Sequence, residues 1–119
     1  MENETRIYIL TEFTITTGKV DAFREIAQEL LDIVKEKEPE TLRYIWYFDK
    51  NQNKSYLVEE YPNAAALRAH AIHVGVTLPK ILKISKPKFV VLGKPNLVTK
   101  EILSGFGFQD FIYWNGLAR

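Results

Sequence analysis

The chain has 119 residues, of which 46% are hydrophobic and 26% are charged, and its formal net charge is +1. This length is typical of one domain, so we expect a single domain over residues 1–119. The near-zero net charge gives no indication that the protein binds nucleic acid. The absence of cysteine excludes disulfides, thiolate nucleophiles and sulfur-ligated metals. The acidic N-terminus lacks signal-peptide features, and no apolar run reaches the roughly 20 residues that cross a bilayer. We therefore predict a cytoplasmic protein without a membrane partner.

The first half of the chain predicts a strand, a helix and a β-hairpin. Apolar residues alternate with polar ones over residues 6–15, as in a strand. From Val20 to Val34 the apolar residues recur at helical spacing, and Pro39 ends this helix because the residue before a proline leaves the helical region. Two segments rich in strand-forming residues, 41–49 and 56–61, flank the polar turn 50–54.

The second half predicts two helices, a strand, and an additional helix and strand. Asn63 is suited to cap a helix over 64–74, which Gly75 would end in a left-handed conformation. A short helix over about 79–85, a strand over 88–92, a helix from Asn96 to about Leu103 and a strand over 108–114 follow. The order is that of an α+β, ferredoxin-like βαββαβ fold with an extra C-terminal helix and strand.

The hairpin carries large apolar side chains on both of its faces. Tyr44 and Trp46 lie on one face, while Ile45 and Tyr47 lie on the other. Helices packed on one side of the sheet cover only one face, and monomers rarely expose a contiguous apolar patch. We therefore expect a homodimer formed through the sheet. The sequence leaves open which face lines a pocket and which meets the second subunit.

Residues 41–49 (TLRYIWYFD) and 58–70 (VEEYPNAAALRAH) resemble the antibiotic biosynthesis monooxygenase family. The family pattern is a strand, a turn, a strand ending in Glu-x-Tyr and a helix containing Ala-Leu-x-x-His, which Glu59, Tyr61 and residues 66–70 match. The resemblance implies a dimeric α+β barrel with a pocket between sheet and helices. It also implies chemistry that varies among members: oxidation of quinols or phenols by O₂ without metal or flavin, haem degradation, or isomerisation.

Two residues are candidates for catalysis, His70 and Glu59. His70 lies on the apolar stripe of its predicted helix, where a neutral imidazole could take a proton from a phenol. The alternative is a core histidine satisfied by a hydrogen bond. Glu59 points the same way as Tyr61 in its strand, so a contact with His70 would orient the ring and raise its basicity. The alternative for Glu59 is an exposed cross-strand charge.

Four residues are candidates for substrate binding. Tyr44, Trp46 and Tyr61 could together line a flat slot for an aromatic ring, although core packing is the better explanation for any one of them taken singly. Thr11 enters through the resemblance, because Thr11 and Tyr61 occupy the positions where haem-degrading relatives have Asn and Trp. That difference disfavours haem degradation.

No metal is predicted. His70 and His73 are three residues apart, but no third ligand follows at suitable spacing.

The leading hypothesis is therefore a cofactor-independent monooxygenase acting with O₂ on a quinol or another electron-rich aromatic molecule. In this hypothesis His70 removes a phenolic proton, and the substrate itself reduces O₂. Two alternatives remain open. One is a non-catalytic aromatic-ligand-binding or stress-response module, and the other is an isomerase or cyclase that works by proton transfer alone.

Overall fold

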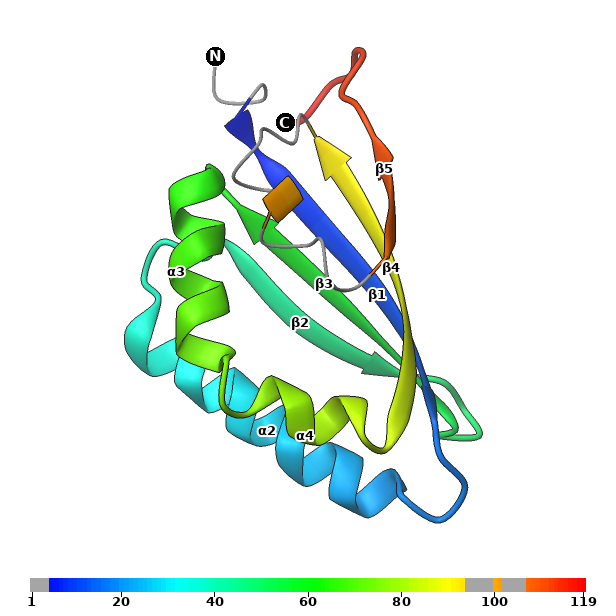
Figure 1. Cartoon of the computed structure of the whole chain (residues 1–119). Helices are drawn as coiled ribbons and strands as arrows, with labels where there is room; N and C mark the ends of the chain where they lie inside the picture. Colours follow the sequence, from blue (N-terminus) through cyan, green and yellow to red (C-terminus); the bar gives the residue numbers. More distant parts are fainter. Residues whose placement is uncertain (1–4, 94–99, 102–106) are drawn as a thin grey trace.

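The computed structural model describes residues 5–93, 100–101 and 107–119 (Figure 1). Its elements are β1 (Ile7–Ile15), α2 (Val20–Lys37), β2 (Arg43–Phe48), β3 (Lys54–Tyr61), α3 (Ala64–Val74), α4 (Leu78–Leu82), β4 (Ser85–Gly93) and β5 (Phe108–Phe111). This order confirms the predicted α+β ferredoxin-like fold and its extra C-terminal strand. The helix predicted from Asn96 to about Leu103 lies outside the described residues, apart from Lys100 and Glu101.

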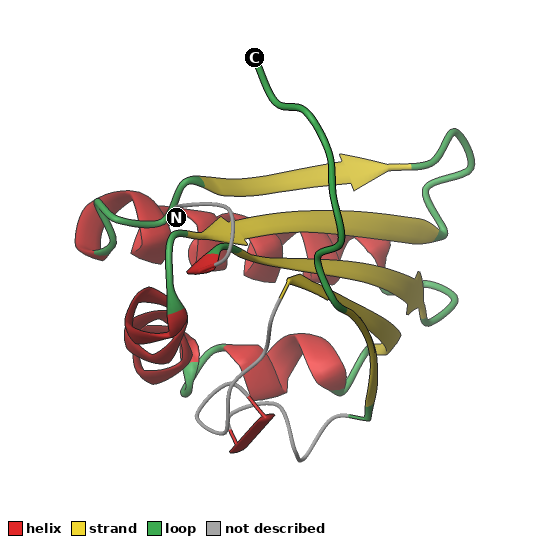
Figure 2. Ribbon diagram, turned by 90° about the horizontal axis from the view of Figure 1, so that it is seen from above, coloured by secondary structure: helices red, strands yellow, loops and turns green. Residues whose placement is uncertain are grey.

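The strands form a single sheet in the order β2-β3-β1-β4-β5. The pairs β2–β3, β3–β1 and β1–β4 are antiparallel, and the pair β4–β5 is parallel. Helices α2, α3 and α4 lie along one face of this sheet (Figure 1). Seen from above, the strands curve, and the chain after β5 runs across them as a loop whose end projects beyond the sheet (Figure 2). Among the described residues, no helix combines the length and the apolar content that crossing a membrane requires.

The strand register shows which side chains face the helices. Trp46, Leu57, Thr11 and Phe89 lie opposite one another in a row across four strands, so they share a face. Thr11 and Leu57 are buried beneath the helices. The alternate residues point to the other face, where Tyr47 is 54% exposed. The register therefore assigns Tyr44 and Trp46 to the inner face and Ile45 and Tyr47 to the outer face.

The helical periodicity predicted for α2 is confirmed by its buried residues, Phe23, Ala27, Leu30 and Val34. Phe23 meets the edge of Phe13 with ring centroids 5.5 Å apart, and Trp46 stacks on Phe13 at 5.6 Å. This aromatic cluster fixes the helix against the inner face of the sheet. Aromatic pairs of this geometry contribute about 0.5–1.5 kcal/mol beyond their buried area.

Three local predictions were wrong. Gly75 is not left-handed: its φ is −58°, because the chain continues in near-helical backbone toward α4 instead of reversing. The short helix α4 ends at Leu82, and β4 already begins at Ser85 because it pairs with β1 up to Ile15. The last strand ends at Phe111 and does not reach Trp114, since the register with β4 stops at Leu92.

Candidate functional site

Helix α3 directs His70 toward the sheet. The side chain of Asn63 caps the helix by accepting a hydrogen bond from the backbone N–H of Ala66 at 2.9 Å, as predicted. The buried residues of the helix are Ala66, Leu67, His70 and Val74, which recur at helical spacing. His70 is thereby held on the apolar face of a capped helix, where its imidazole cannot reach bulk water freely.

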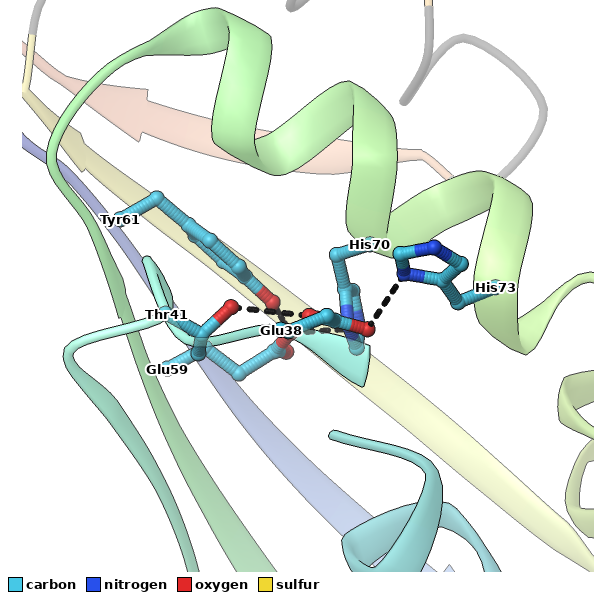
Figure 3. A network of polar contacts seen from close by, with 6 residues as sticks. All are labelled: Glu38, Thr41, Glu59, Tyr61, His70 and His73. Atoms are coloured by element: carbon cyan, nitrogen blue, oxygen red, sulfur yellow. Dashed lines mark hydrogen bonds and ion pairs between the residues drawn. The ribbon is translucent and has the colours of Figure 1, made fainter. Parts of the chain in front are cut away.

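The His70 ring lies between two buried carboxylates (Figure 3). Its Nδ1 is 2.9 Å from Oε1 and 3.1 Å from Oε2 of Glu38, and its Nε2 is 3.3 Å from Oε1 of Glu59. The exposed fractions of the three side chains are 8% for His70, 2% for Glu38 and 8% for Glu59. With a carboxylate facing each ring nitrogen, both nitrogens serve best as N–H donors, which is the state of an imidazolium.

Glu38 reaches this position because α2 ends there. Pro39 excludes the preceding residue from the helical region, and Glu38 takes φ −127° and ψ 70°. Thr41 donates a hydrogen bond to Oε1 of Glu38 at 2.8 Å. His73, one turn after His70 on α3, lies with its Nδ1 3.2 Å from Oε2 of Glu38. Glu38 thus joins both histidines of the chain to the end of α2.

Glu59 is held from the strand side. It lies on the inner face of β3, and the hydroxyl of Tyr61 donates to its Oε1 at 2.5 Å. The contact expected between Glu59 and His70 is therefore present, and Glu59 is not an exposed cross-strand charge. Glu60 points to the outer face, where its carboxylate pairs with Arg6 and with Arg43.

The surroundings of His70 favour its charged form. Burial alone would lower the pKa of His70, but the hydrogen bonds and charges of Glu38 and Glu59 outweigh it and raise this pKa from 6.5 to about 9. Burial likewise would raise the pKa of Glu38, yet the hydrogen bond and charge of His70 lower it overall. These contacts therefore favour an imidazolium at neutral pH, in place of the neutral imidazole base expected from the sequence.

Two tyrosine rings complete the enclosure of His70. The ring centroids of Tyr44 and Tyr61 lie 5.2 Å and 5.4 Å from that of His70. Burial, reinforced by the negative charge of Glu59, raises the pKa of both phenols well above 10. Both tyrosines stay neutral, and their ring faces are within the distance at which aromatic rings attract a cation.

A cavity of about 70 Å³ lies between the sheet and the helices. Apolar side chains make up most of its wall, which is lined by Ile9, Thr11, Phe13, Tyr44, Leu57, Glu59, Leu67, His70, Ala71, Val74, Leu78 and Phe89. Thr11 is fully buried, and its hydroxyl has no hydrogen-bond partner among the described residues. An unpaired buried hydroxyl is costly, so Thr11 offers the cavity a polar group that a ligand can satisfy.

Four of the six residues predicted for the site line this cavity: Thr11, Tyr44, Glu59 and His70. Tyr61 lies behind Glu59 and bonds to it, while Trp46 belongs to the aromatic cluster of Phe13 and Phe23. Glu38 and Thr41 were not predicted from the sequence. The available signal was an acidic residue directly before the proline that ends α2. No group of three or more residues suited to hold a metal occurs in the part of the chain that the structure describes.

These features define a ferredoxin-like α+β protein with a buried carboxylate–imidazole array at the wall of an apolar cavity. The chain belongs to the antibiotic biosynthesis monooxygenase family, whose sequence model matches residues 6–73. The match extends from β1 to His73 and so includes every residue of the array. A search of curated proteins found no match.

Solved structures support the same fold. MupZ from Pseudomonas fluorescens is similar with a TM-score of 0.84 and 18% identity, over 97% of this chain and 95% of MupZ. A structure named antibiotic biosynthesis monooxygenase has a TM-score of 0.64 and 22% identity, over 71% of this chain and 94% of its own. A conserved protein from Methanosarcina mazei Go1 has a TM-score of 0.68 and 16% identity, over 79% and 97% of the two chains. At these identities the comparisons show the fold alone.

Proposed function

We propose that the protein is a cofactor-independent monooxygenase that oxidises a quinol or another electron-rich aromatic molecule with O₂. The observation that carries this proposal is the placement of Glu59 and His70 at the wall of a mostly apolar cavity. An enclosed, largely apolar site strengthens electrostatic interactions and protects reactive intermediates from water. Membership of the family supports a monooxygenase, and the substrate class is our inference.

The first step is removal of a phenolic proton. Glu59 is the base in this proposal, because its carboxylate lines the cavity while His70 is already protonated at neutral pH. The imidazolium stabilises the phenolate that forms, as a fixed charge near developing negative charge does in many enzymes. Thr11 donates its hydroxyl to a substrate oxygen. The roles of base and electrostatic partner are thus reversed from those expected from the sequence.

The substrate then supplies every electron. The phenolate gives one electron to O₂, and the two radicals combine to form a carbon–oxygen bond at a ring carbon. Cleavage of the oxygen–oxygen bond leaves one oxygen atom on the substrate and releases the other as water. For a hydroquinone with a free ring position, the balance is hydroquinone plus O₂ giving a hydroxyquinone plus water, and no external reductant is needed.

The size of the cavity limits the substrate. A volume of about 70 Å³ is small beside the roughly 300–1,000 Å³ of sites that hold drug-sized ligands. A single aromatic ring therefore enters only when lining side chains shift, and a polycyclic substrate would require a much larger rearrangement. We infer that single-ring quinols are the preferred class.

Oxygen uptake tests this proposal. The purified chain, treated with a chelator, is mixed with a panel of single-ring hydroquinones while O₂ is followed with an electrode and products by mass spectrometry. We expect uptake of one O₂ per hydroxyquinone formed. Ligand-induced thermal stabilisation without O₂ consumption would contradict the oxygenase and indicate a non-catalytic aromatic-binding module.

The protonated state of His70 also favours a second function, an isomerase or cyclase that works by proton transfer. An imidazolium with its pKa near 9 is a proton donor at neutral pH, and Glu59 beside it is a proton acceptor. A pair of this kind can move a proton between two atoms of one substrate. Product formed at the same rate under strictly anaerobic conditions would identify this function in place of the oxygenase.

Replacing Thr11 with valine tests the ligand-facing role of its hydroxyl. Valine keeps the shape but removes an unpaired buried hydroxyl, so we expect the free energy of unfolding without ligand to stay equal or to rise by about 1 kcal/mol. Affinity for a hydroquinone should fall by about tenfold, because one hydrogen bond is lost. Urea unfolding and ligand titration measure the two effects. A lower free energy of unfolding, with unchanged affinity for the hydroquinone, would instead assign the hydroxyl a structural role.

We also propose that the protein acts as a homodimer through the outer face of the sheet. Ile45, Val58, Leu10 and Val90 lie opposite one another in an apolar row across this face. Exposed aromatic residues continue it, and the exposed fractions are 54% for Tyr47, 39% for Tyr56 and 48% for Phe111. The labelled helices lie on the other face of the sheet (Figure 1). Residues 113–118 lie beside Arg6 and Tyr8 at one end of the outer face, and a second copy of this face would bury the remainder.

The dimer predicts a specific effect of charge on the outer face. Tyr47→Lys places an ammonium where an aromatic ring would be buried, so we expect a monomer at concentrations where the wild type is a dimer. Light scattering after size-exclusion chromatography measures the mass. Lys35→Gln, a change at an exposed position of α2 on the other side of the sheet, is the control and should stay dimeric. A monomeric wild type at high concentration would contradict the proposal.

A further inference from the structure

We propose that Glu38 and His73 form a proton path between His70 and solvent, so that His70 exchanges its Nδ1 proton with water when the charge of Glu59 changes. This inference rests on the proposed function only in that chemistry in the cavity delivers a proton to Glu59. It assigns roles to Glu38 and His73 that proton transfer within the cavity does not itself require. The four residues Glu59, His70, Glu38 and His73 are called the relay below.

The relay is a continuous chain of alternating acids and imidazoles (Figure 3). Glu59 to His70 is 3.3 Å, His70 to Glu38 is 2.9 Å, and Glu38 to His73 is 3.2 Å. Contacts of this length lie within or close to the range over which a proton moves directly between two groups. Oε2 of Glu38 contacts both rings, since it is 3.1 Å from Nδ1 of His70 and 3.2 Å from Nδ1 of His73.

The two ends of the relay line two different cavities. Glu59 and His70 line the apolar cavity of about 70 Å³. Glu38 and His73 line a second cavity of about 140 Å³, on the side of the end of α2. The exposed fraction of the side chain rises from 2% at Glu38 to 29% at His73. The relay therefore runs from the apolar cavity, through a buried carboxylate, to a histidine in contact with solvent.

The direction of transfer follows from the charges around His70. The groups that face its ring are Glu38 from the end of α2, Glu59 and Tyr61 from β3, and Tyr44 from β2. A proton that arrives at Glu59 removes negative charge beside the ring, which favours release of the Nδ1 proton to Glu38. His73 takes this proton from Oε2 of Glu38, which contacts both rings, and its ring gives one to water. One proton therefore leaves at His73 when Glu59 takes one up. One returns to His70 when Glu59 gives its proton to the departing oxygen, so the overall reaction releases no net proton.

His73 is suited to the exposed end of the relay. One nitrogen of an imidazole can accept a proton while the other donates one, and the side chain of His73 is 29% exposed. Lys37 and Glu40 line the same outer cavity and are the other charged groups near its mouth. Thr41 donates to Glu38 and positions it, but a hydroxyl in that place need not carry the proton itself.

The first measurement is turnover of the full chain with a hydroquinone in dilute buffer. In His73→Gln the amide can still donate to Glu38 but cannot carry a proton, so we expect kcat to fall by about tenfold or more with KM unchanged. In His73→Ala, added imidazole should restore kcat, because a free imidazole can occupy the vacated space. Arg68→Gln, an exposed change on the same helix, is the matched control and should leave kcat unchanged.

The second measurement needs no turnover. Nitrogen-15-labelled histidine gives the exchange rate of the His70 ring protons with water by nuclear magnetic resonance. We expect this exchange to slow by about tenfold in His73→Gln and to recover with imidazole in His73→Ala. The control Arg68→Gln should match the wild type. Slower exchange in the His73 variants supports the relay even if no hydroquinone is oxidised, which separates it from failure of the proposed function.

The opposite result overturns the relay. If His70 exchanges protons equally fast in the wild type, His73→Gln and His73→Ala, protons reach His70 by another route. Oxygen uptake that persists in that case leaves the proposed function intact and removes only the relay. A fall in kcat that imidazole does not restore in His73→Ala, with unchanged exchange, would show that His73 has a structural role.

Discussion

Replacing Glu59 with glutamine is expected to lower kcat by about a hundredfold to ten-thousandfold, the usual contribution of a positioned general base. Glutamine keeps the size of the side chain, and its carbonyl oxygen can still accept from Tyr61 and His70. The variant cannot take up a phenolic proton, so the loss should appear in kcat and less in KM. Steady-state O₂ uptake at saturating hydroquinone measures it.

Glu60→Gln is the matched control for this experiment. Glu60 is the next residue of β3, and the exposed fraction of its side chain is 6% against 8% for Glu59. Its carboxylate pairs with Arg6 and Arg43 on the outer face, away from the cavity. We expect this change to cost some stability while the folded protein keeps its kcat. Equal losses of kcat in both variants would contradict a catalytic role for Glu59.

The second large effect is on the pH dependence of stability. His70 has a folded-state pKa of about 9, above the value near 6.5 of an unfolded chain. Its contribution is therefore complete below pH 6.5 and is lost as the pH rises through 9. The raised pKa corresponds to about 3 kcal/mol at most. The lowered pKa of Glu38 acts on the acid side, since its contribution is lost as the pH falls below its usual value of 4.5.

Urea unfolding at pH 6 and at pH 9.5 checks this prediction. The wild type should lose about 3 kcal/mol of unfolding free energy between the two values. His70→Leu should remove most of this difference. It should also lower the free energy of unfolding at pH 6 by about 3–5 kcal/mol, because the positive charge of the imidazolium between two buried carboxylates is removed. His73→Gln, which leaves His70 in place, should keep the pH dependence. A wild type equally stable at both pH values would contradict the buried imidazolium.

The sequence contains most of the information needed for the fold, because periodicity reports burial directly. The alternation of β1 and the helical spacing of α2 each match the faces that pack. The strand pattern also placed Glu59 and Tyr61 on one face, and the helical stripe placed His70 toward the sheet. These residues meet because regular elements carry them, so their contact was predictable once the order of elements was known.

The remaining parts of the site depend on contacts that no periodicity describes. Glu38 lies where a helix has just ended, and its direction depends on the backbone angles of one residue. The state of His70 could not be predicted without Glu38, because one carboxylate would not by itself indicate a pKa near 9. Trp46 is aromatic and lies on the inner face of the sheet, as a residue that lines the pocket would. Only its packing on Phe13 shows that it belongs to the core.

Pro39 makes the length of α2 a determinant of the site. An α-helix turns by about 100° per residue, so one residue inserted or deleted before Pro39 would move the acid at its end away from both histidines. The sheet, the hairpin and Glu59 would be unaffected by such a change. This helix ending therefore gives protein engineers a place where an acidic group can be installed or removed independently of the sheet. In related sequences, an acidic residue directly before a helix-ending proline is the feature to trace.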